Sequence, residues 1–96
     1  MALRRRTTLP RGRPKGALSF DADVAQAFGA VLRKARVAAE MSQETLAHAS
    51  RVERSYLGRI ERGQSQPTLL VILKVAAALG WDGAMLVAAT EETLKS

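Results

Sequence analysis

Two short helical patterns follow one another closely between Ser42 and Gly63, and no other feature restricts the fold of this chain more. The first pattern covers about residues 43–50 and the second about residues 54–62, so the break between them is too short for an ordinary loop. The apolar residues that would face each other are Leu46, Ala47, Val52, Leu57 and Ile60. Helices joined this tightly must cross and pack directly on each other. The spacing therefore predicts a helix-turn-helix pair.

The opposite side of the second helix carries polar and basic residues, and the small residues among them keep the helix slim. Its residues are Arg54, Ser55, Gly58, Arg59 and Arg62. A slim helix with arginines on its outer side has the shape and charge to enter the major groove of DNA. The alternative is an ordinary solvated helix face, which is the usual place for surface arginines.

The segment SYLGRIERG, from Ser55 to Gly63, is the most specific part of the motif. It resembles the helix-turn-helix of the phage-repressor-like (XRE, Cro/CI-type) DNA-binding family, and the resemblance extends from about Ala30 to Leu86. It implies an all-α, five-helix lambda-repressor-like domain that binds double-stranded DNA. The family usually has glycine at the turn, whereas this chain has Arg51. A left-handed conformation there would cost roughly 1 kcal/mol, so the turn is either strained or differently shaped.

The resemblance also implies which residues would read bases. In the family, exposed positions at the start and middle of the second helix face base edges, and Arg54, Ser55 and Arg59 match them. An arginine can donate two hydrogen bonds to guanine O6 and N7, which discriminates by about 1–3 kcal/mol. Glu53 precedes these residues, and we expect it to cap the second helix rather than to accept from a cytosine.

The phosphate contacts implied by the same resemblance involve the start of the first motif helix and the residues after the second. They are Ser42, Gln43, Tyr56, Arg62, Gln64 and Ser65. Plain capping would also explain Ser42, and polar loop residues need no ligand. Tyr56 could equally pack at the edge of its helix.

Two further sets of residues are given structural roles. In the resembling fold an arginine on the first helix pairs with the glutamate that corresponds to Glu61, and here that arginine is Arg36.

One recognition helix reads few base pairs, so two are usually placed about 34 Å apart by a two-fold dimer. We expect the fifth helix to form the dimer interface through Met85, Ala89 and Leu94. The alternative is that they complete the core of a monomer.

The net charge of +6 is concentrated at the start of the chain. Six basic residues precede the first acid, and they are Arg4, Arg5, Arg6, Arg11, Arg13 and Lys15. The remaining basic and acidic residues are equal in number. We therefore expect residues 1–18 to form a basic, flexible arm and residues 19–96 to form the helical domain.

The arm contains Pro10-Arg11-Gly12-Arg13-Pro14, which resembles the core of an AT-hook. Arginines seek the negative potential of a narrow minor groove, and glycine lets the backbone lie on the groove floor. The minor-groove candidates are Arg11, Gly12, Arg13 and Lys15. A nonspecific phosphate-binding arm is an equal alternative, and organelle targeting is a third, less favoured because prolines and glycines break any amphipathic helix.

Helical spacing and capping residues predict the other three helices. The first begins after Ser19 or Asp21 and runs to about Glu40. Thr68 caps a fourth helix that ends at Leu79, and its apolar residues are numerous enough to be buried on more than one side. Asp82 caps the fifth helix.

Composition excludes several classes of protein. Cysteine is absent, which rules out disulfides and thiolate metal sites. His48 is the single histidine and has no clustered acids around it, so we predict no metal, cofactor or enzyme activity. The longest apolar run, from Leu69 to Trp81, is too short to span a bilayer. We therefore expect a cytoplasmic, nucleoid-associated protein.

These observations favour a homodimeric transcriptional repressor that binds a palindromic operator. One alternative is an antitoxin or a restriction–modification controller that also binds a protein partner. Another is a helical adaptor without DNA binding, but arginines at two base-reading positions, Arg54 and Arg59, argue against it.

Overall fold

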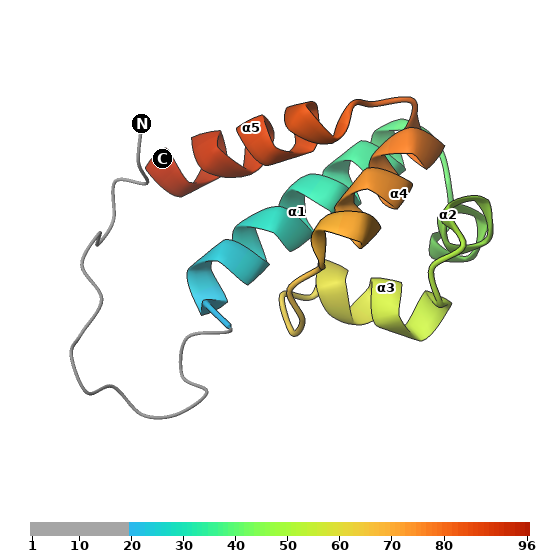
Figure 1. The fold of residues 1–96 in the computed structure, drawn as a ribbon, viewed down its shortest axis with the longest axis horizontal. Helices are drawn as coiled ribbons and strands as arrows, with labels where there is room; N and C mark the ends of the chain where they lie inside the picture. Colours follow the sequence, from blue (N-terminus) through green and yellow to red (C-terminus); the bar gives the residue numbers. More distant parts are fainter. Residues whose placement is uncertain (1–19) are drawn as a thin grey trace.

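The structure is a computed structural model that describes residues 20–96, which fold into five α-helices without a strand (Figure 1). The helices are α1 (Ala22–Ala38), α2 (Gln43–Ser50), α3 (Arg54–Glu61), α4 (Leu69–Leu79) and α5 (Gly83–Lys95). The predicted all-α, five-helix architecture is confirmed, although α1 ends two residues before the expected Glu40. The arm candidates Arg11, Gly12, Arg13 and Lys15 lie outside the described residues.

Side-chain caps explain where three of the helices begin. Asp21, Ser42 and Thr68 each accept a hydrogen bond from the backbone N–H three residues later, at 3.1, 2.9 and 3.2 Å. Glu53 and Asp82 occupy the same position before α3 and α5, but neither makes a side-chain capping bond. The side-chain caps predicted at Glu53 and Asp82 are therefore wrong, although both residues occupy the N-cap position of their helix.

The turn between α2 and α3 has the left-handed conformation that glycine usually supplies. Arg51 has φ 60° and ψ 39°, and its N–H donates to the last turn of α2. A non-glycine residue in this conformation costs roughly 1–2 kcal/mol. The turn therefore keeps the shape implied by the resemblance and is strained. Glu40, at the end of α1, has φ 59° and is a second such residue.

The core lies where α1, α2, α3, α4 and α5 meet, and the motif contributes much of it. The facing residues predicted for α2 and α3 are all buried, with exposed fractions of 7% or less. The largest fully buried side chains are Leu32, Leu46, Leu57, Ile60, Leu86 and Val75. Because α1 packs against both α3 and α5, the second motif helix is fixed to the longest helix of the domain.

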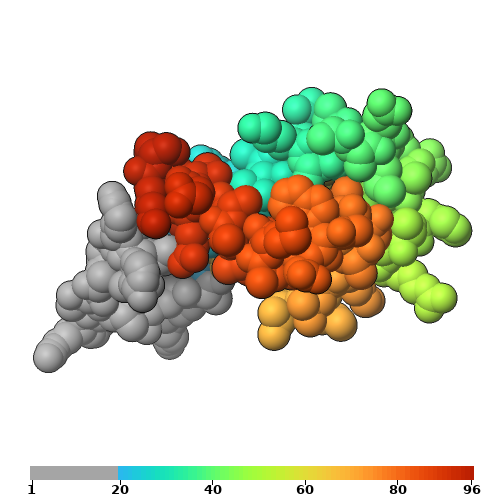
Figure 2. Space-filling view, turned by 90° about the horizontal axis from the view of Figure 1, so that it is seen from above, coloured from blue at the N-terminus to red at the C-terminus, as the bar shows by residue number. Residues whose placement is uncertain are grey.

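α4 corrects one expectation from the sequence. Of its apolar residues only Val75 and Ala76 are buried, whereas Leu69, Leu70 and Leu73 are 70%, 60% and 49% exposed. The helix lies at the surface of the domain (Figure 1), where it packs mainly against α2 and α5. Side chains of α4 and α5 form one continuous side of the molecule (Figure 2).

We call the exposed apolar surface of Leu69, Leu70, Leu73 and Met85 the α4–α5 face. Its two helices are in direct contact, because a Cβ built on Gly83 of α5 would lie 2.7 Å from Leu73 Cδ2. Among residues 20–96, no single helix is long and apolar enough to cross a membrane. Within the same residues, α4 and α5 taken together have the required length and composition, but the two helices are bent by 105° relative to each other.

Candidate nucleic-acid interface

α3 presents the three predicted base-reading residues to solvent. Arg54, Ser55 and Arg59 are exposed, while Leu57 and Ile60 on the other side of the helix are fully buried. The helix is therefore held by its apolar side, and its three predicted base-reading residues remain exposed, whereas Gly58 on the same polar side is buried next to the side chains of Arg62 and Gln43. Both short motif helices lie at one end of the domain (Figure 1).

A buried ion pair joins α1 to the end of α3. Arg36 Nε donates to Glu61 Oε2 at 2.7 Å, and Arg36 Nη2 donates to Glu61 Oε1 at 2.9 Å. A third donor of the guanidinium, Nη1, reaches the Met41 carbonyl at 2.8 Å. The hydrogen bonds to Glu61 raise the pKa of Arg36 above its ordinary value. The pair therefore has the two-bond geometry typical of strong arginine–carboxylate contacts.

Gln43 connects this pair to Arg54, one of the predicted base-reading residues. Its Nε2 donates to Glu61 Oε1 at 3.0 Å, and its Oε1 accepts from Arg54 Nη1 at 3.3 Å. A buried carboxylate therefore orients the amide, and the amide in turn holds Arg54. Sequence reasoning missed this link, because nothing in the spacing shows that Gln43 and Arg54 approach each other across the motif.

The residues that follow α3 form a second polar group. Gly63 has φ 76° and ends the helix, and the N–H of Gln64 donates to the Arg59 carbonyl at 2.8 Å. Arg62 Nε donates to Gln64 Oε1 at 3.3 Å, which joins two predicted phosphate contacts. Ser65 is half-buried in the same loop.

Tyr56 lies between α3 and this loop. Its ring is half-buried against the core, and its hydroxyl donates to the Gln66 carbonyl at 3.4 Å. The Arg59 guanidinium lies over the ring, 5.4 Å from its centroid. The structure thus gives Tyr56 two contacts inside the protein that the sequence did not suggest.

Ser42 remains exposed at the start of α2, where its hydroxyl caps the helix and also donates to Thr45 Oγ1 at 2.9 Å. His48 is exposed as well. No group of three or more metal-binding side chains occurs in the part of the chain that the structure describes.

The three predicted dimer residues do not share one face of α5. Met85 is 49% exposed, whereas Ala89 and Leu94 are half-buried. Leu94 lies nine residues after Met85, which at about 100° per residue places it on the opposite side of the helix. Leu94 therefore lies on a different side of α5 from Met85.

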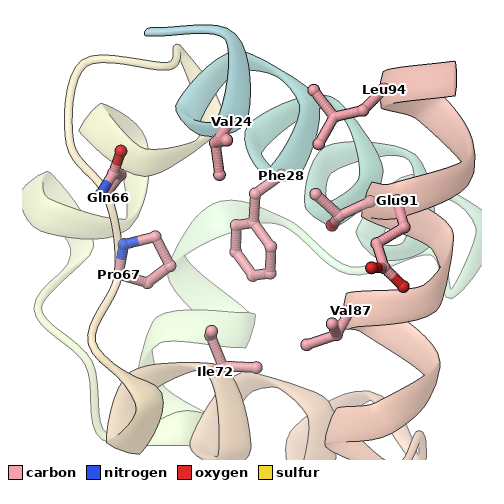
Figure 3. Close-up of a pocket in the computed structure, with 9 residues that line it drawn as sticks. Val24, Phe28, Gln66, Pro67, Ile72, Val87, Glu91 and Leu94 are labelled. Carbon is pink, nitrogen blue, oxygen red and sulfur yellow. The ribbon is translucent and has the colours of Figure 1, made fainter. Parts of the chain in front are cut away.

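Leu94 instead lines an apolar hollow of about 340 Å³ between α1, α5 and the loop before α4 (Figure 3). Phe28 and Val87 point into this hollow, and Gln66 and Pro67 form its opposite edge. The hollow therefore adjoins the loop that carries the Tyr56 contact.

Comparisons with known proteins agree with this geometry. The sequence model of the helix-turn-helix family HTH_3 matches residues 32–82. A crystal structure of the clp gene regulator ClgR from Corynebacterium glutamicum is similar with a TM-score of 0.71 and 30% identity, covering 75% of this chain and 77% of that one. No curated protein matches the chain.

Two other solved structures are similar. The restriction–modification controller protein C.AhdI from Aeromonas hydrophila has 47% identity and a TM-score of 0.63, over 65% of this chain and 94% of that one. An HTH_3 family transcriptional regulator from Vibrio cholerae has 28% identity and a TM-score of 0.66, over 73% of this chain and 40% of that one.

Proposed function

The chain belongs to the helix-turn-helix family HTH_3 and is a DNA-binding transcription regulator, and we propose that it is a homodimeric repressor of a palindromic operator. The observation that carries the proposal is the exposed basic side of α3, with Arg54 and Arg59 on a helix whose other side is fully buried. Such a helix can enter a major groove without unfolding any of the core. In this proposal the protein acts by binding DNA and catalyses no reaction.

Base reading is assigned to Arg54, Ser55 and Arg59. Both arginines are held by neighbours in the absence of DNA, Arg54 by Gln43 and Arg59 by the Tyr56 ring. Side chains that are already oriented lose less conformational freedom when they bind. This supports a role in reading bases rather than in general attraction to DNA.

Phosphate contacts are assigned to the start of α2 and to the residues directly after α3, namely Ser42, Gln43, Arg62, Gln64 and Ser65. Ser42 and Gln43 lie at the N-terminus of α2, where backbone N–H groups and the helix dipole favour an anion. Phosphate contacts at both of these places would fix how deeply α3 enters the groove.

We also propose that the basic arm of residues 1–18 contacts DNA beside the operator when the regulator acts at the nucleoid. The residues proposed for this contact are Arg11, Gly12, Arg13 and Lys15.

Replacing Arg59 by alanine should weaken binding to the operator by about 5- to 150-fold while random duplex binding changes little, since a bidentate contact to guanine is worth about 1–3 kcal/mol. The operator would first be obtained by in-vitro selection, and affinities measured by fluorescence anisotropy at one salt concentration. Arg33→Ala, an exposed arginine on α1, is the matched control. If Arg59→Ala weakened binding to the operator and to random duplex equally, Arg59 would contact phosphate rather than a base.

Dimerisation is proposed through the α4–α5 face. It exposes three leucines and a methionine, and large apolar patches of this kind mark interaction sites on soluble domains. Met85 and the half-buried Ala89, one helical turn apart on α5, support this choice of interface. A two-fold dimer is the arrangement that would present two copies of α3 to one palindromic operator.

The variant Leu69→Glu should convert the dimer to a monomer and weaken operator binding. Leu69 is 70% exposed and lies in the first turn of α4, where a glutamate suits the helix dipole, so the monomer should still fold. Sedimentation equilibrium would measure the mass. Val37→Glu, at an apolar α1 residue that is 52% exposed, should leave the dimer intact. If the Leu69→Glu protein were still a dimer, the dimer interface would lie outside the α4–α5 face.

A restriction–modification controller is the second candidate, and the 47% identity to C.AhdI favours it. Such a protein would use the same DNA-binding surface, so the difference lies in the regulated genes and in any additional protein partner. A neighbouring gene for a restriction endonuclease or DNA methyltransferase would support it, and a toxin gene would support an antitoxin.

A further inference from the structure

We infer that Tyr56 is a positioning residue that holds Arg59 in the orientation needed to read a base. The inference deepens the proposed function, because it takes Arg59 as a base-reading residue and names the side chain that orients it. Its starting point is the contact of the Arg59 guanidinium with the Tyr56 ring, at 5.4 Å from the centroid. Cation–π attraction acts within about 6 Å of a ring centroid.

The spacing of the two residues makes this contact a feature of the helix itself. Tyr56 and Arg59 are three residues apart on α3, and residues at this spacing are neighbours on a helix surface. Arg59 is exposed and its alternative conformations would extend into solvent. The ring therefore selects among the orientations that a long, flexible side chain can adopt.

The ring can do this because its packing against the core holds it in place, with or without the hydroxyl. Its base is half-buried against the core, and its hydroxyl donates to the Gln66 carbonyl at 3.4 Å. The side-chain Oε1 of Gln66 accepts from the backbone N–H of Asp21, which ties this loop to the start of α1. Tyr56 therefore contacts both the core and the loop after α3, and Gln66 links that loop to the start of α1. Its ring is more restricted than that of a surface tyrosine.

The guanidinium can contact this ring and bind DNA at the same time. The cation–π contact with the ring is not a hydrogen bond, so it leaves the N–H donors of the guanidinium available. Those donors are the ones that would bond to guanine O6 and N7. The contact with the ring thus orients Arg59 without occupying the donors that would read the base.

This assignment changes the role that the sequence suggested for Tyr56. A direct contact with phosphate requires the hydroxyl, whereas positioning of Arg59 requires the aromatic ring. The two roles can be separated, because Tyr56→Phe removes only the hydroxyl and Tyr56→Leu removes the ring while keeping an apolar side chain.

The test is a double-mutant cycle on the ratio of operator affinity to random-duplex affinity. Tyr56→Leu should lower this ratio by roughly two- to fivefold, which corresponds to the strength of an exposed cation–π contact. Tyr56→Phe, the matched control, should keep the ratio close to that of the wild type. In the Arg59→Ala background, Tyr56→Leu should have no further effect on the ratio.

Other outcomes separate the inference from the proposed function. If Tyr56→Leu lowers the ratio equally with and without Arg59, the ring acts on its own and the inference is wrong. If Tyr56→Phe lowers the ratio as much as Tyr56→Leu, the hydroxyl is responsible and the inference is again wrong. If Arg59→Ala leaves the ratio unchanged, Arg59 reads no base and the proposed function itself fails.

A second measurement needs no variant that might be unfolded. In NMR spectra of the wild-type protein without DNA, the side-chain Cδ protons of Arg59 should be shifted upfield by the ring current of Tyr56. The Tyr56→Phe protein should retain this shift. Values for Arg59 equal to those of a solvated arginine would overturn the inference directly.

Discussion

Glu61→Ala is expected to lower the free energy of unfolding by about 3–5 kcal/mol, because it leaves a charged guanidinium buried without its partner. Arg36 and Glu61 are only 9% and 8% exposed, so water cannot replace the lost carboxylate at low cost. Arg36 would keep one bond, to the Met41 carbonyl, out of the three that it makes now. A domain of this size is stable by only about 5–15 kcal/mol, so the variant should be close to unfolding at growth temperatures.

Arg59→Ala is the matched comparison, because it removes a charged side chain from α3 that is exposed rather than buried. Its melting temperature should stay close to that of the wild type, as is usual for surface substitutions. Thermal unfolding followed by circular dichroism would measure both variants. Equal melting temperatures for Glu61→Ala and Arg59→Ala would contradict the structural role of the pair.

The same substitution should also affect DNA binding in any fraction that remains folded. Glu61 Oε1 accepts from Gln43, whose own oxygen accepts from Arg54. Without the carboxylate, the amide can rotate and no longer fixes Arg54. The buried pair therefore supports the fold and, through Gln43, one of the residues proposed to read bases.

How far the sequence predicted this arrangement depends on the kind of interaction. The facing residues of the motif, such as Leu46 and Leu57, were predictable because helical periodicity marks one buried side of each helix. The caps at Ser42 and Thr68 were predictable because capping is a contact within one turn. Such local patterns determined the five helices almost to the residue.

Contacts between elements were much harder to predict. Periodicity shows that α4 is apolar on several sides but not how many neighbours it has, so the exposure of Leu69 and Leu70 was missed. The bond between Gln43 and Arg54 and the contact of Arg59 with Tyr56 depend on how side chains meet once the helices are packed. They orient both arginines that are proposed to read bases, so the shape of the site could be described only from the structure.

α1 and α3 approach each other closely at Gly29, a glycine that the sequence did not single out. Gly29 is buried in the middle of α1, where glycine is about 1 kcal/mol less favourable than alanine. A Cβ atom built there would lie 2.3 Å from the Ile60 carbonyl oxygen and 2.8 Å from that of Glu61. Both are backbone atoms of α3, so no side-chain rotation can relieve the overlap.

Gly29→Ala is therefore expected to destabilise the domain by about 1–3 kcal/mol or more, despite its better helix propensity, because α1 and α3 must move apart. Gly58→Ala is the matched control within α3. Its Cβ would meet only side-chain atoms, Arg62 Nη1 at 3.0 Å and Gln43 Oε1 at 3.6 Å, which can shift. That variant should unfold at or slightly above the wild-type temperature.

The comparison also tests whether the position of α3 depends on α1. Separation of the two helices would strain the bonds between Arg36 and Glu61, which cross the same contact. Gly29→Ala should therefore weaken operator binding even at temperatures where circular dichroism shows it folded, although the substitution lies in the core and touches no DNA. Stability and operator affinity equal to those of the wild type would show that α1 does not set the position of the helix that reads DNA.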